Sequence, residues 1–250
     1  MSILNKIIEQ KKIEIKNISL EQKINNVKNV SFYEKLNEDR LHLIAEVKQA
    51  SPSKGIIYKS FNPIELASSF ENNGASCISV LTDQEFFKGH IDFLINVKQK
   101  TSLPVLRKDF IIDIKQVEET KAIGADVMLL ILDILDVKQA NELIDCAREN
   151  KIEILLEIHS EEALNKLSDI KFKPVVGVNN RNLNTFECNN NWAIEKAKQI
   201  KELDQQIKVI AESGYNLPIE MEMLDKSDVN GVLIGEGLSK NKDLLEWFNK

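Results

Sequence analysis

Cysteine is scarce in this chain, which contains only three among 250 residues. Cys77, Cys146 and Cys188 form no CxxC pair and have none of the Cys/His spacings that bind zinc. An odd number of widely separated cysteines also argues against a disulfide framework. We therefore expect three reduced, partly buried thiols, as in a cytoplasmic protein.

Long apolar runs and an excess of positive charge are missing as well. No uninterrupted apolar stretch approaches the ~20 residues of a membrane span, and the N-terminus has no signal-peptide core followed by a cleavage site. The formal net charge is -6 and the pI is about 5.3, whereas a nucleic-acid partner requires a basic face. We expect no membrane and no nucleic-acid partner, so an anionic substrate would need a locally basic mouth.

The residues that are present predict a barrel. A chain of 250 residues that is 43% hydrophobic can bury a full core, and we expect one (β/α)8 domain over residues 1–250. Short apolar runs alternate with amphipathic stretches, which favours parallel strands joined by right-handed crossovers. The alternative is a doubly wound open sheet, which would gather its ligand groups at one switch point. Strands are expected at residues 43–48, 77–82, 104–109, 126–131, 152–158, 175–179, 208–213 and 231–235, and helices at 63–72, 114–122, 137–150 and 192–203.

The first 41 residues lie outside this repeat and form an N-terminal helical extension. Its apolar positions mark one helical face, with lysines among them: Ile3, Leu4, Ile7, Ile8, Ile15 and Ile18, and Lys6, Lys11, Lys12 and Lys16. A basic amphipathic helix can lie on a membrane surface. Glu9, Glu14 and Glu21 dilute the positive charge, so a helix packed across the barrel is the favoured interpretation.

Charged or amide side chains end several of the apolar runs: Glu46, Lys48, Lys108, Glu157, Asn179 and Glu212. A strand buried on both faces can release a charged side chain only where it emerges, so these residues should share one rim. Glu46, Lys108 and Glu157 end the first, third and fifth strands, and alternate strands of a barrel contribute to the same layer. Period two also places Lys48 on the same side of its strand as Glu46.

Seven ordered sequence blocks carry a more specific signal. They read IAEVKQASPSKG (44–55), SVLTDQEFFKG (79–89), VLRKDFIID (105–113), LLEIH (155–159), VGVNNRNL (176–183), IAESG (210–214) and LIGEGL (233–238). With ILNKIIEQKK near the start, these blocks closely resemble the indole-3-glycerol-phosphate synthase family of tryptophan biosynthesis. The resemblance implies a (β/α)8 TIM barrel with an extra N-terminal helix. It implies conversion of 1-(2-carboxyphenylamino)-1-deoxyribulose 5-phosphate into indole-3-glycerol phosphate, carbon dioxide and water, without a metal or an organic cofactor.

The resemblance and the chemistry together assign catalytic roles. An aromatic carbon must attack a ketone whose oxygen needs a proton, and Lys108 is the candidate general acid. Glu157 is the candidate general base, and Glu46 stabilises the cationic intermediate or assists dehydration. By resemblance Lys48 helps to hold the substrate anions, with a role in dehydration as an alternative. Asn179 would orient the substrate hydroxyl or a catalytic carboxylate.

The remaining site residues are assigned to binding. Arg181 offers a planar fork for a carboxylate or phosphate. Ser51, Glu212 and Ser213 complete the polar contacts, and the segment 51–57 is either a mobile loop over the substrate or an ordinary turn. An apolar slot for the aromatic ring would be lined by Pro52, Leu81, Phe87, Phe110 and Leu129.

The phosphate site is expected at the last two strand ends. Small residues permit close approach there, and backbone amides would bind the phosphate at Ser213, Gly214, Gly235 and Gly237, with Lys48 nearby. Glu236 stands between the last two glycines, and we expect its carboxylate to point outward because it would repel phosphate.

Two other function classes stay open. The first is a different phosphosugar barrel: a Schiff-base lyase using Lys108, or phosphoribosylanthranilate isomerase, against which the lack of a cysteine at the first strand end argues. The second is a non-catalytic subunit of a tryptophan pathway complex. His42, His90 and His159 show no metal-ligand spacing and are interpreted as surface or structural residues. We expect a monomer, or weak association with other enzymes of that pathway.

Overall fold

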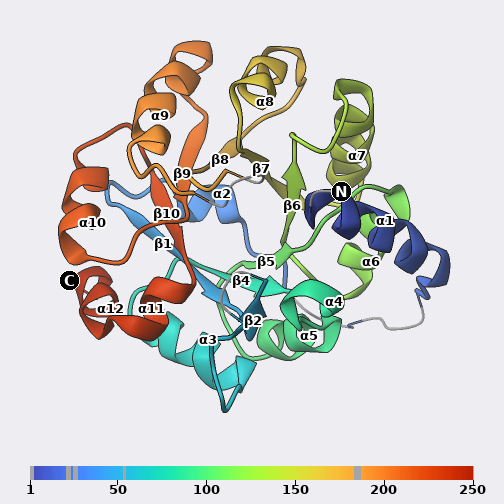
Figure 1. Cartoon of the computed structure of the whole chain (residues 1–250), viewed down its shortest axis with the longest axis horizontal. Helices are drawn as coiled ribbons and strands as arrows, with labels where there is room; N and C mark the ends of the chain where they lie inside the picture. The colour runs from blue at the N-terminus through green and yellow to red at the C-terminus, as the bar shows by residue number, and fades with distance from the viewer. Residues whose placement is uncertain (1–2, 21–23, 25–27, 53–54, 183–186, 250) are drawn as a thin grey trace.

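A computed structural model describes residues 3–20, 24, 28–52, 55–182 and 187–249. Eight parallel strands close into a barrel in the order β1-β10-β9-β8-β7-β6-β5-β4 (Figure 1). Because β1 pairs with both β4 and β10, the ring is complete and the alternative of an open sheet is wrong. The barrel strands are β1 His42–Val47, β4 Cys77–Leu81, β5 Val105–Lys108, β6 Val127–Ile131, β7 Glu153–Ile158, β8 Val175–Asn179, β9 Lys208–Glu212 and β10 Gly231–Ile234.

Helices surround this ring (Figure 1). Four helices predicted from the sequence are confirmed at or within one residue of the expected ends: α3 Pro63–Asn72, α6 Ile114–Ala122, α7 Val137–Glu149 and α9 Trp192–Leu203. Polar side chains cap several helices, as the Asn62 carboxamide does at the start of α3. The other helices are α1 Ile3–Glu14, α2 Phe32–Lys35, α4 Gln84–Phe87, α5 Ile91–Lys98, α8 Glu161–Lys166, α10 Pro218–Asp225, α11 Glu236–Lys240 and α12 Lys242–Phe248.

The segment after β1 forms a short hairpin. Strands β2 (Ala50–Ser51) and β3 (Gly55–Ile56) pair in antiparallel fashion, with Ser51 opposite Gly55. Ser53 and Lys54 lie outside the described residues, so the predicted mobile loop over 51–57 is described only at its two ends. Glu21, used above to weigh the charge of the extension, also lies outside them.

The barrel interior is built in layers. Alternation along each strand sends one set of side chains into the barrel and the other toward the helices, where the larger core lies. Ile44, Leu106, Leu155 and Ile210 form one inner layer, with one residue from each of β1, β5, β7 and β9. Two residues further along these strands stand Glu46, Lys108, Glu157 and Glu212. The apolar layer therefore supports a charged layer at the carboxyl end of the barrel.

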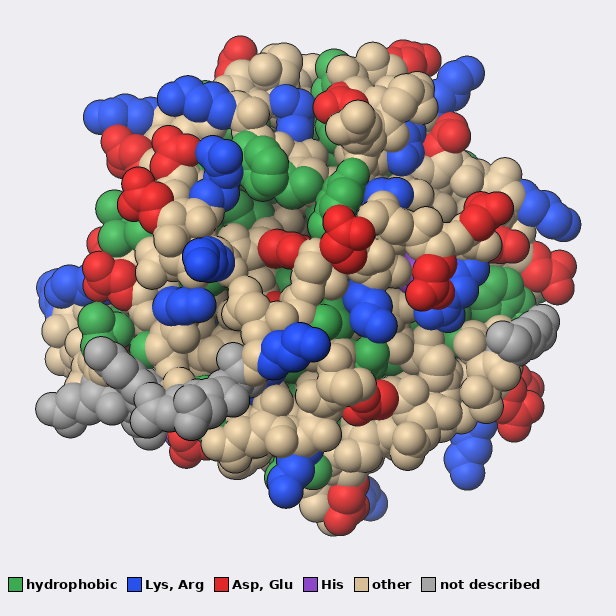
Figure 2. All heavy atoms as spheres, turned by 180° about the vertical axis from the view of Figure 1, so that it is seen from behind, with side chains coloured by type: hydrophobic (Ala, Val, Ile, Leu, Met, Phe, Trp, Pro, Cys, Tyr) green, Lys and Arg blue, Asp and Glu red, His purple; other side chains and the backbone are tan. Residues whose placement is uncertain are grey.

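The surface charge and the helix lengths can be compared with the expectation of no nucleic-acid and no membrane partner. Seen from behind, acidic and basic side chains are interspersed among the described residues, and no broad single-sign patch is visible from this side (Figure 2). Across the described part of the chain, no helix is both long and apolar enough to cross a bilayer.

Candidate active site

A cavity of about 580 Å³ opens at the carboxyl ends of the barrel strands. Every residue assigned to the site from the sequence lines it: Glu46, Lys48, Ser51, Pro52, Leu81, Phe87, Lys108, Phe110, Leu129, Glu157, Asn179, Arg181, Glu212, Ser213, Gly214, Gly235, Glu236 and Gly237. These residues come from all eight barrel strands or the loops that follow them. The shared rim predicted from charges at strand ends is therefore one continuous wall.

Lys108 lies between two buried carboxylates. Its Nζ is 2.5 Å from Glu157 Oε2 and 2.8 Å from Glu212 Oε2. The Lys108 side chain is 13% exposed, whereas both glutamates are almost fully buried. The ammonium group of Lys108 thus pairs with two carboxyl groups at the floor of the cavity. It remains partly exposed to a ligand bound in the cavity.

This arrangement shifts the pKa of all three groups. Burial opposes the charge of Lys108, but Glu157, Glu212 and Glu46 outweigh it and raise the pKa of Lys108, which holds the group as an ammonium. Burial likewise opposes the charge of Glu157, yet Lys108 and His159 lower the pKa of that carboxyl. For Glu212, burial and the neighbouring charge of Glu157 prevail over Lys108 and raise the pKa to about 8. Two glutamates on one lysine therefore hold their protons very differently.

Two glycines make room for the glutamates of neighbouring strands. A Cβ added at Gly177 on β8 would collide with the Glu212 carboxylate, and one at Gly235 would collide with the Glu46 carboxylate. Glu212 Oε1 has no hydrogen-bond partner in the described structure. The space that a side chain at Gly177 or Gly235 would fill is thus occupied by the carboxyl groups of Glu212 and Glu46.

Glu46 and Glu157 each have a second polar neighbour. The Lys48 ammonium contacts Glu46 Oε2, as the period-two spacing predicted. Asn179 Nδ2 donates to Glu157 Oε1 at 2.9 Å, and Asn179 Oδ1 accepts the backbone N–H of Arg181. Of the two roles open to Asn179, the contact with a carboxylate is the one present in this structure.

An apolar wall faces the charged floor. The rings of Phe87 and Phe110 lie with centroids 6.1 Å apart, and Leu81 and Leu129 line the cavity beside them. Helix α1 contributes further apolar side chains to the same wall, namely Ile3, Leu4 and Ile7. The N-terminal helix thus packs over the barrel mouth, and its apolar face is part of the cavity.

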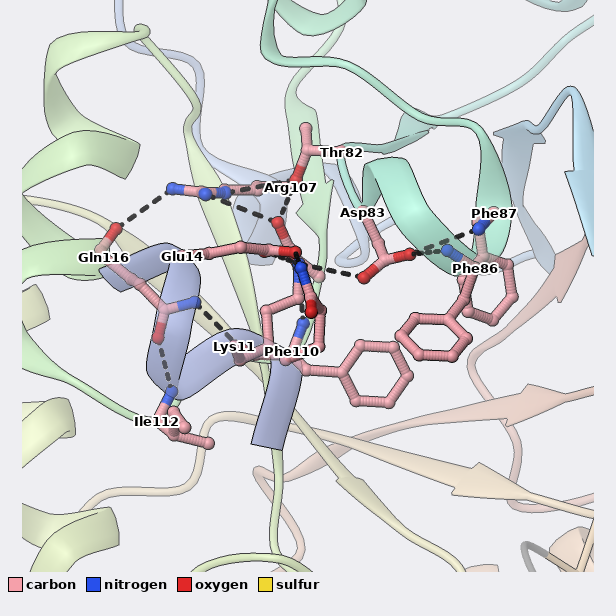
Figure 3. Close-up of polar contacts among 12 residues, drawn as sticks. Lys11, Glu14, Thr82, Asp83, Phe86, Phe87, Arg107, Phe110, Ile112 and Gln116 are labelled. Carbon is pink, nitrogen blue, oxygen red and sulfur yellow. Dashed lines mark hydrogen bonds and ion pairs between the residues drawn. The ribbon is translucent and has the colours of Figure 1, made fainter. Parts of the chain in front are cut away.

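A buried lysine fastens this helix in place (Figure 3). Lys11 Nζ is 2.9 Å from Asp83 Oδ2, 2.8 Å from Asp109 Oδ1 and 2.8 Å from Glu14 Oε2, and its side chain is 3% exposed. Asp83 in turn caps helix α4 by accepting the backbone N–H groups of Phe86 and Phe87. The ion pairs join α1 to the N-cap of α4, which carries Phe87, and to the segment after β5, which carries Phe110.

The rim expected to bind phosphate has unusual backbone geometry. Ser213 has φ 66 and Gly214 has φ 91, so a non-glycine residue occupies the left-handed region directly after β9. A Cβ at Gly214 would collide with the Asn190 carboxamide, and one at Gly237 would lie 2.7 Å from the carbonyl oxygen of Tyr215. Glycine is required at both positions.

The first residue of α11 resolves a question raised by the sequence. Glu236 lines the cavity, but its carboxylate pairs with Lys240 one turn along the same helix. The expected repulsion of a phosphate is reduced by this lysine, which also lines the cavity.

The structure adds one contact at Arg181 and corrects one expectation about the thiols. The Arg181 carbonyl oxygen accepts a hydrogen bond from His159, in addition to the guanidinium that the sequence singled out. Cys77 is buried and Cys146 is half-buried, but Cys188 is exposed, so the expectation of three partly buried thiols is wrong for that residue. Among the described residues, no group of three His, Cys, Asp or Glu side chains is placed to hold a metal ion.

The comparisons with known proteins agree with the order of blocks in the sequence. The family model described as indole-3-glycerol phosphate synthase matches residues 4–249. The chain belongs to the indole-3-glycerol phosphate synthase family. It is 45% identical over 250 residues to the synthase of Priestia megaterium, covering 99% of this chain and 96% of the relative. It is 41% identical over 240 residues to that of Bacillus pumilus, covering 95% and 94%. Its function is indole-3-glycerol phosphate synthesis in tryptophan biosynthesis.

Solved structures agree at the level of fold. A crystal structure of KGPDC from Streptococcus mutans aligns with a TM-score of 0.60 at 12% identity, covering 84% of this chain and 95% of that one. At this identity the likeness shows the barrel alone.

Within this synthase barrel, sequence reasoning missed several polar residues of the cavity, namely Asp109, His159, Tyr215, Asn216 and Lys240. His159 was interpreted as a surface or structural histidine, but it lines the cavity and its Nε2 contacts Glu157 Oε1. A usable signal was present, because His159 follows Glu157 by two residues, as Lys48 follows Glu46.

Proposed function

We propose that this synthase works as a carboxy-lyase in which Lys108 is the general acid, Glu157 the general base and Glu46 a second carboxylate. The observation that carries the proposal is the position of Lys108 between Glu157 and Glu212, opposite the Phe87 and Phe110 rings. A cation beside an aromatic slot suits a substrate whose ketone oxygen gains negative charge while its ring carbon attacks.

Ring closure is the first step of the proposed mechanism. The ring carbon that bears the carboxylate attacks the ketone carbon, so a carbon–carbon bond forms and the carbonyl π electrons move to oxygen. Lys108 donates a proton to that oxygen, which leaves a hydroxyl group and a cationic ring. The raised pKa of Lys108 keeps the proton on the ammonium group until negative charge develops nearby.

Decarboxylation and dehydration complete the reaction. The bond from the ring to the carboxyl carbon breaks, carbon dioxide leaves, and its electron pair neutralises the cation. The hydroxyl then leaves as water after protonation, for which Lys48 or the neutral form of Glu212 is available. Glu157 removes the proton whose loss yields indole, while Glu46 stabilises the intermediate cation. The lowered pKa of Glu157 keeps it ionised for this task.

Binding roles follow from the two walls of the cavity. Phe87, Phe110 and the apolar face of α1 hold the aromatic ring, and Arg181 with Lys48 balances the substrate anions. The phosphate is placed against the backbone of the Ser213–Gly214 turn and near Gly237. Gly235 keeps its predicted place at the phosphate site and also makes room for Glu46, because a side chain there would strike that carboxylate.

The state of Lys108 weighs against a Schiff-base lyase. A Schiff base requires a neutral amine, whereas two carboxylates raise the pKa of Lys108 and keep it protonated. Borohydride reduction in the presence of substrate tests this point, since covalent trapping at Lys108 would favour the alternative.

The direct test is turnover. Purified protein is mixed with 1-(2-carboxyphenylamino)-1-deoxyribulose 5-phosphate, and the rise of indole fluorescence is followed together with release of carbon dioxide. We expect both products in equal amounts. Indole formation without carbon dioxide, or no turnover by folded protein, would contradict the proposal.

Two properties complete the proposal. We expect a monomer, or weak association with other tryptophan pathway enzymes, and action in the cytoplasm. Light scattering at increasing protein concentration tests the first point, and a stable oligomer at low concentration would contradict it.

A further inference from the structure

The side chain of His159 is buried directly behind Glu157. It is 4% exposed and follows β7, two residues after Glu157. Its Nδ1 lies 2.9 Å from the carbonyl oxygen of Arg181, and its Nε2 contacts Glu157 Oε1. The ring is therefore hydrogen-bonded at Nδ1 and in ion-pair contact at Nε2, which has no hydrogen bond in the described structure.

Both of these partners are hydrogen-bond acceptors. A carbonyl oxygen can only accept, so Nδ1 must carry a proton. Nε2 makes no hydrogen bond in the described structure but is in ion-pair contact with Glu157 Oε1, and a lone pair on Nε2 would there face the lone pairs of the carboxylate, so this nitrogen carries a proton too. A neutral imidazole has one proton and would turn a lone pair toward one of these oxygens.

The proton shared with Glu157 belongs on the histidine. Glu157 Oε2 already accepts from Lys108 at 2.5 Å, and Oε1 accepts from Asn179 at 2.9 Å. These donors favour the ionised carboxylate. Burial lowers the pKa of His159, but Glu157 and the Arg181 carbonyl outweigh it, and the pKa is raised from its ordinary value.

The surrounding charges are consistent with a cation at this position. From neighbouring elements the ring faces Asp133, which accepts the His159 backbone N–H at 2.8 Å, in addition to Glu157 on its own strand. Lys108 and Glu212 lie on the far side of Glu157. With His159 charged, the cations of the cavity floor are Lys48, Lys108 and His159, and they face the carboxylates Glu46 and Glu157 and the carboxyl of Glu212, whose raised pKa favours its neutral form.

We propose that His159 is an imidazolium that acts as a positioning residue, holding Glu157 ionised and turned toward the cavity. This inference rests on the proposed role of Glu157 as general base. Lys108 and Asn179 donate hydrogen bonds to the carboxylate of Glu157, His159 is in ion-pair contact with it, and the charge of His159 keeps the carboxylate anionic at rest. Lys108 is then free to give up its proton without leaving Glu157 unpaired.

The charge of His159 can be observed without any assay of activity. The chain has three histidines, so ¹⁵N-labelled protein gives few imidazole signals, which His159→Gln and His90→Gln assign. We expect both ring nitrogens of His159 to be protonated at about pH 7. His90 is the internal comparison, because its Nδ1 accepts the backbone N–H of Asp92. A neutral ring at His159 would overturn the inference.

The effect on Glu157 is read from the pH profile of kcat. His159→Leu removes the donor and the charge, while His159→Gln keeps an N–H near Glu157 but cannot be charged. We expect the acid limb of kcat to move up by about 1 pH unit or more in His159→Leu, and by less in His159→Gln. At about pH 7, kcat should fall roughly tenfold in His159→Leu, and KM should change little.

The matched control is His90→Gln, which alters a half-buried helix-capping histidine outside the set of residues that line the cavity and should leave the profile unchanged. An unmoved acid limb in active His159→Gln and His159→Leu would overturn the inference. If His159→Leu fails to fold, the Gln variant alone decides. Failure of the proposed function appears separately, as lack of turnover by the parent protein.

Discussion

Two buried lysines on opposite sides of the β5 end have similar surroundings and different roles. Lys108 contacts Glu157 and Glu212, while Lys11 contacts Asp83 and Asp109. Lys108 and Asp109 are consecutive in the sequence, so the two clusters include neighbouring residues of the chain. Each lysine joins elements that are distant in the chain.

The difference lies in how many donors each carboxylate receives. Asp109 accepts from Lys11 and the Phe110 backbone on one oxygen, and from Thr82 and Arg107 on the other. Burial would raise its pKa, yet Lys11 and Arg107 lower it to about 2. Glu212 has Lys108 alone on one oxygen and no partner on the other. Asp109, with donors on both oxygens, belongs to a cluster that holds a helix, whereas Glu212, with one oxygen lacking a partner in the described structure, retains capacity for chemistry.

The matched substitutions Lys108→Met and Lys11→Met should separate these roles. The largest expected effect is the loss of turnover in Lys108→Met. Removing a positioned general acid typically lowers kcat by ~10²- to 10⁴-fold. We expect that loss in Lys108→Met with a smaller loss of unfolding free energy than in Lys11→Met, because Glu157 keeps its contacts with Asn179 and His159 and the raised pKa of Glu212 favours its neutral form. Indole fluorescence and urea unfolding provide the two measurements. If Lys108→Met lost several kcal/mol of unfolding free energy but kept the kcat of the parent while folded, the comparison would be reversed.

Glu157→Gln should be the next largest effect. The amide keeps the shape of the side chain but cannot act as a base, and its NH2 group donates where a carboxylate oxygen accepted from Lys108 or Asn179. We expect kcat to drop by ~10²-fold or more, with a smaller change in the binding of substrate. Steady-state kinetics decide the point, since a large rise in KM at constant kcat would make Glu157 a binding residue.

Lys11→Met should act on stability. Breaking a buried ion pair leaves uncompensated carboxylates and costs ~3 kcal/mol or more. We expect a loss of that size in urea unfolding, with faster proteolytic cleavage within α1.

Lys12→Met is the control for that loss. Lys12 lies next along the same helix, is 58% exposed and pairs with Glu9, so its replacement should change stability by less than about 1 kcal/mol. Equal losses of unfolding free energy in Lys11→Met and Lys12→Met would show that the buried contacts of Lys11 stabilise the fold no more than the exposed pair of Lys12.

The two clusters should respond to pH in opposite directions, with smaller effects. The pKa of Asp109 is lowered from 3.8 to about 2, so its stabilising contribution is present above the ordinary value and is lost as the pH falls toward 2. The pKa of Glu212 is raised from 4.5 to about 8, so its contribution is present below 4.5 and is lost as the pH rises through 8.

Urea unfolding of Glu212→Gln and Asp109→Asn across pH tests these signs. The stability of the parent relative to Glu212→Gln should decrease between about pH 5 and pH 8.5. The stability of the parent relative to Asp109→Asn should increase between about pH 2.5 and pH 5. Parallel pH dependence in both comparisons would remove the distinction between the clusters.

The strands and the cavity wall were predictable because they depend on local patterns. Apolar runs with period two place Lys108 inside the barrel and Arg107 outside it, and strand order then brings Glu46, Glu157 and Glu212 to the same depth. These inferences require only the sequence and the geometry of a closed parallel barrel.

Other features depend on contacts between distant segments. The position of α1 over the mouth follows from Lys11 meeting Asp83 and Asp109, and no periodicity in residues 3–14 contains that information. The packing of the Glu46 carboxylate against Gly235 is likewise absent from any local sequence pattern, since only the structure brings the two together. Tertiary charge pairing and packing space are therefore what a single sequence leaves undetermined here.

A single-turnover experiment tests the central claim that the Lys108 cluster performs the chemistry while the Lys11 cluster holds the fold. Enzyme in excess is mixed with 1-(2-carboxyphenylamino)-1-deoxyribulose 5-phosphate, and indole fluorescence reports the chemical step without the release of product. The account predicts that folded Lys108→Met with bound substrate forms indole at least ~10²-fold more slowly than the parent. Formation of indole by that variant at the parent rate would contradict it.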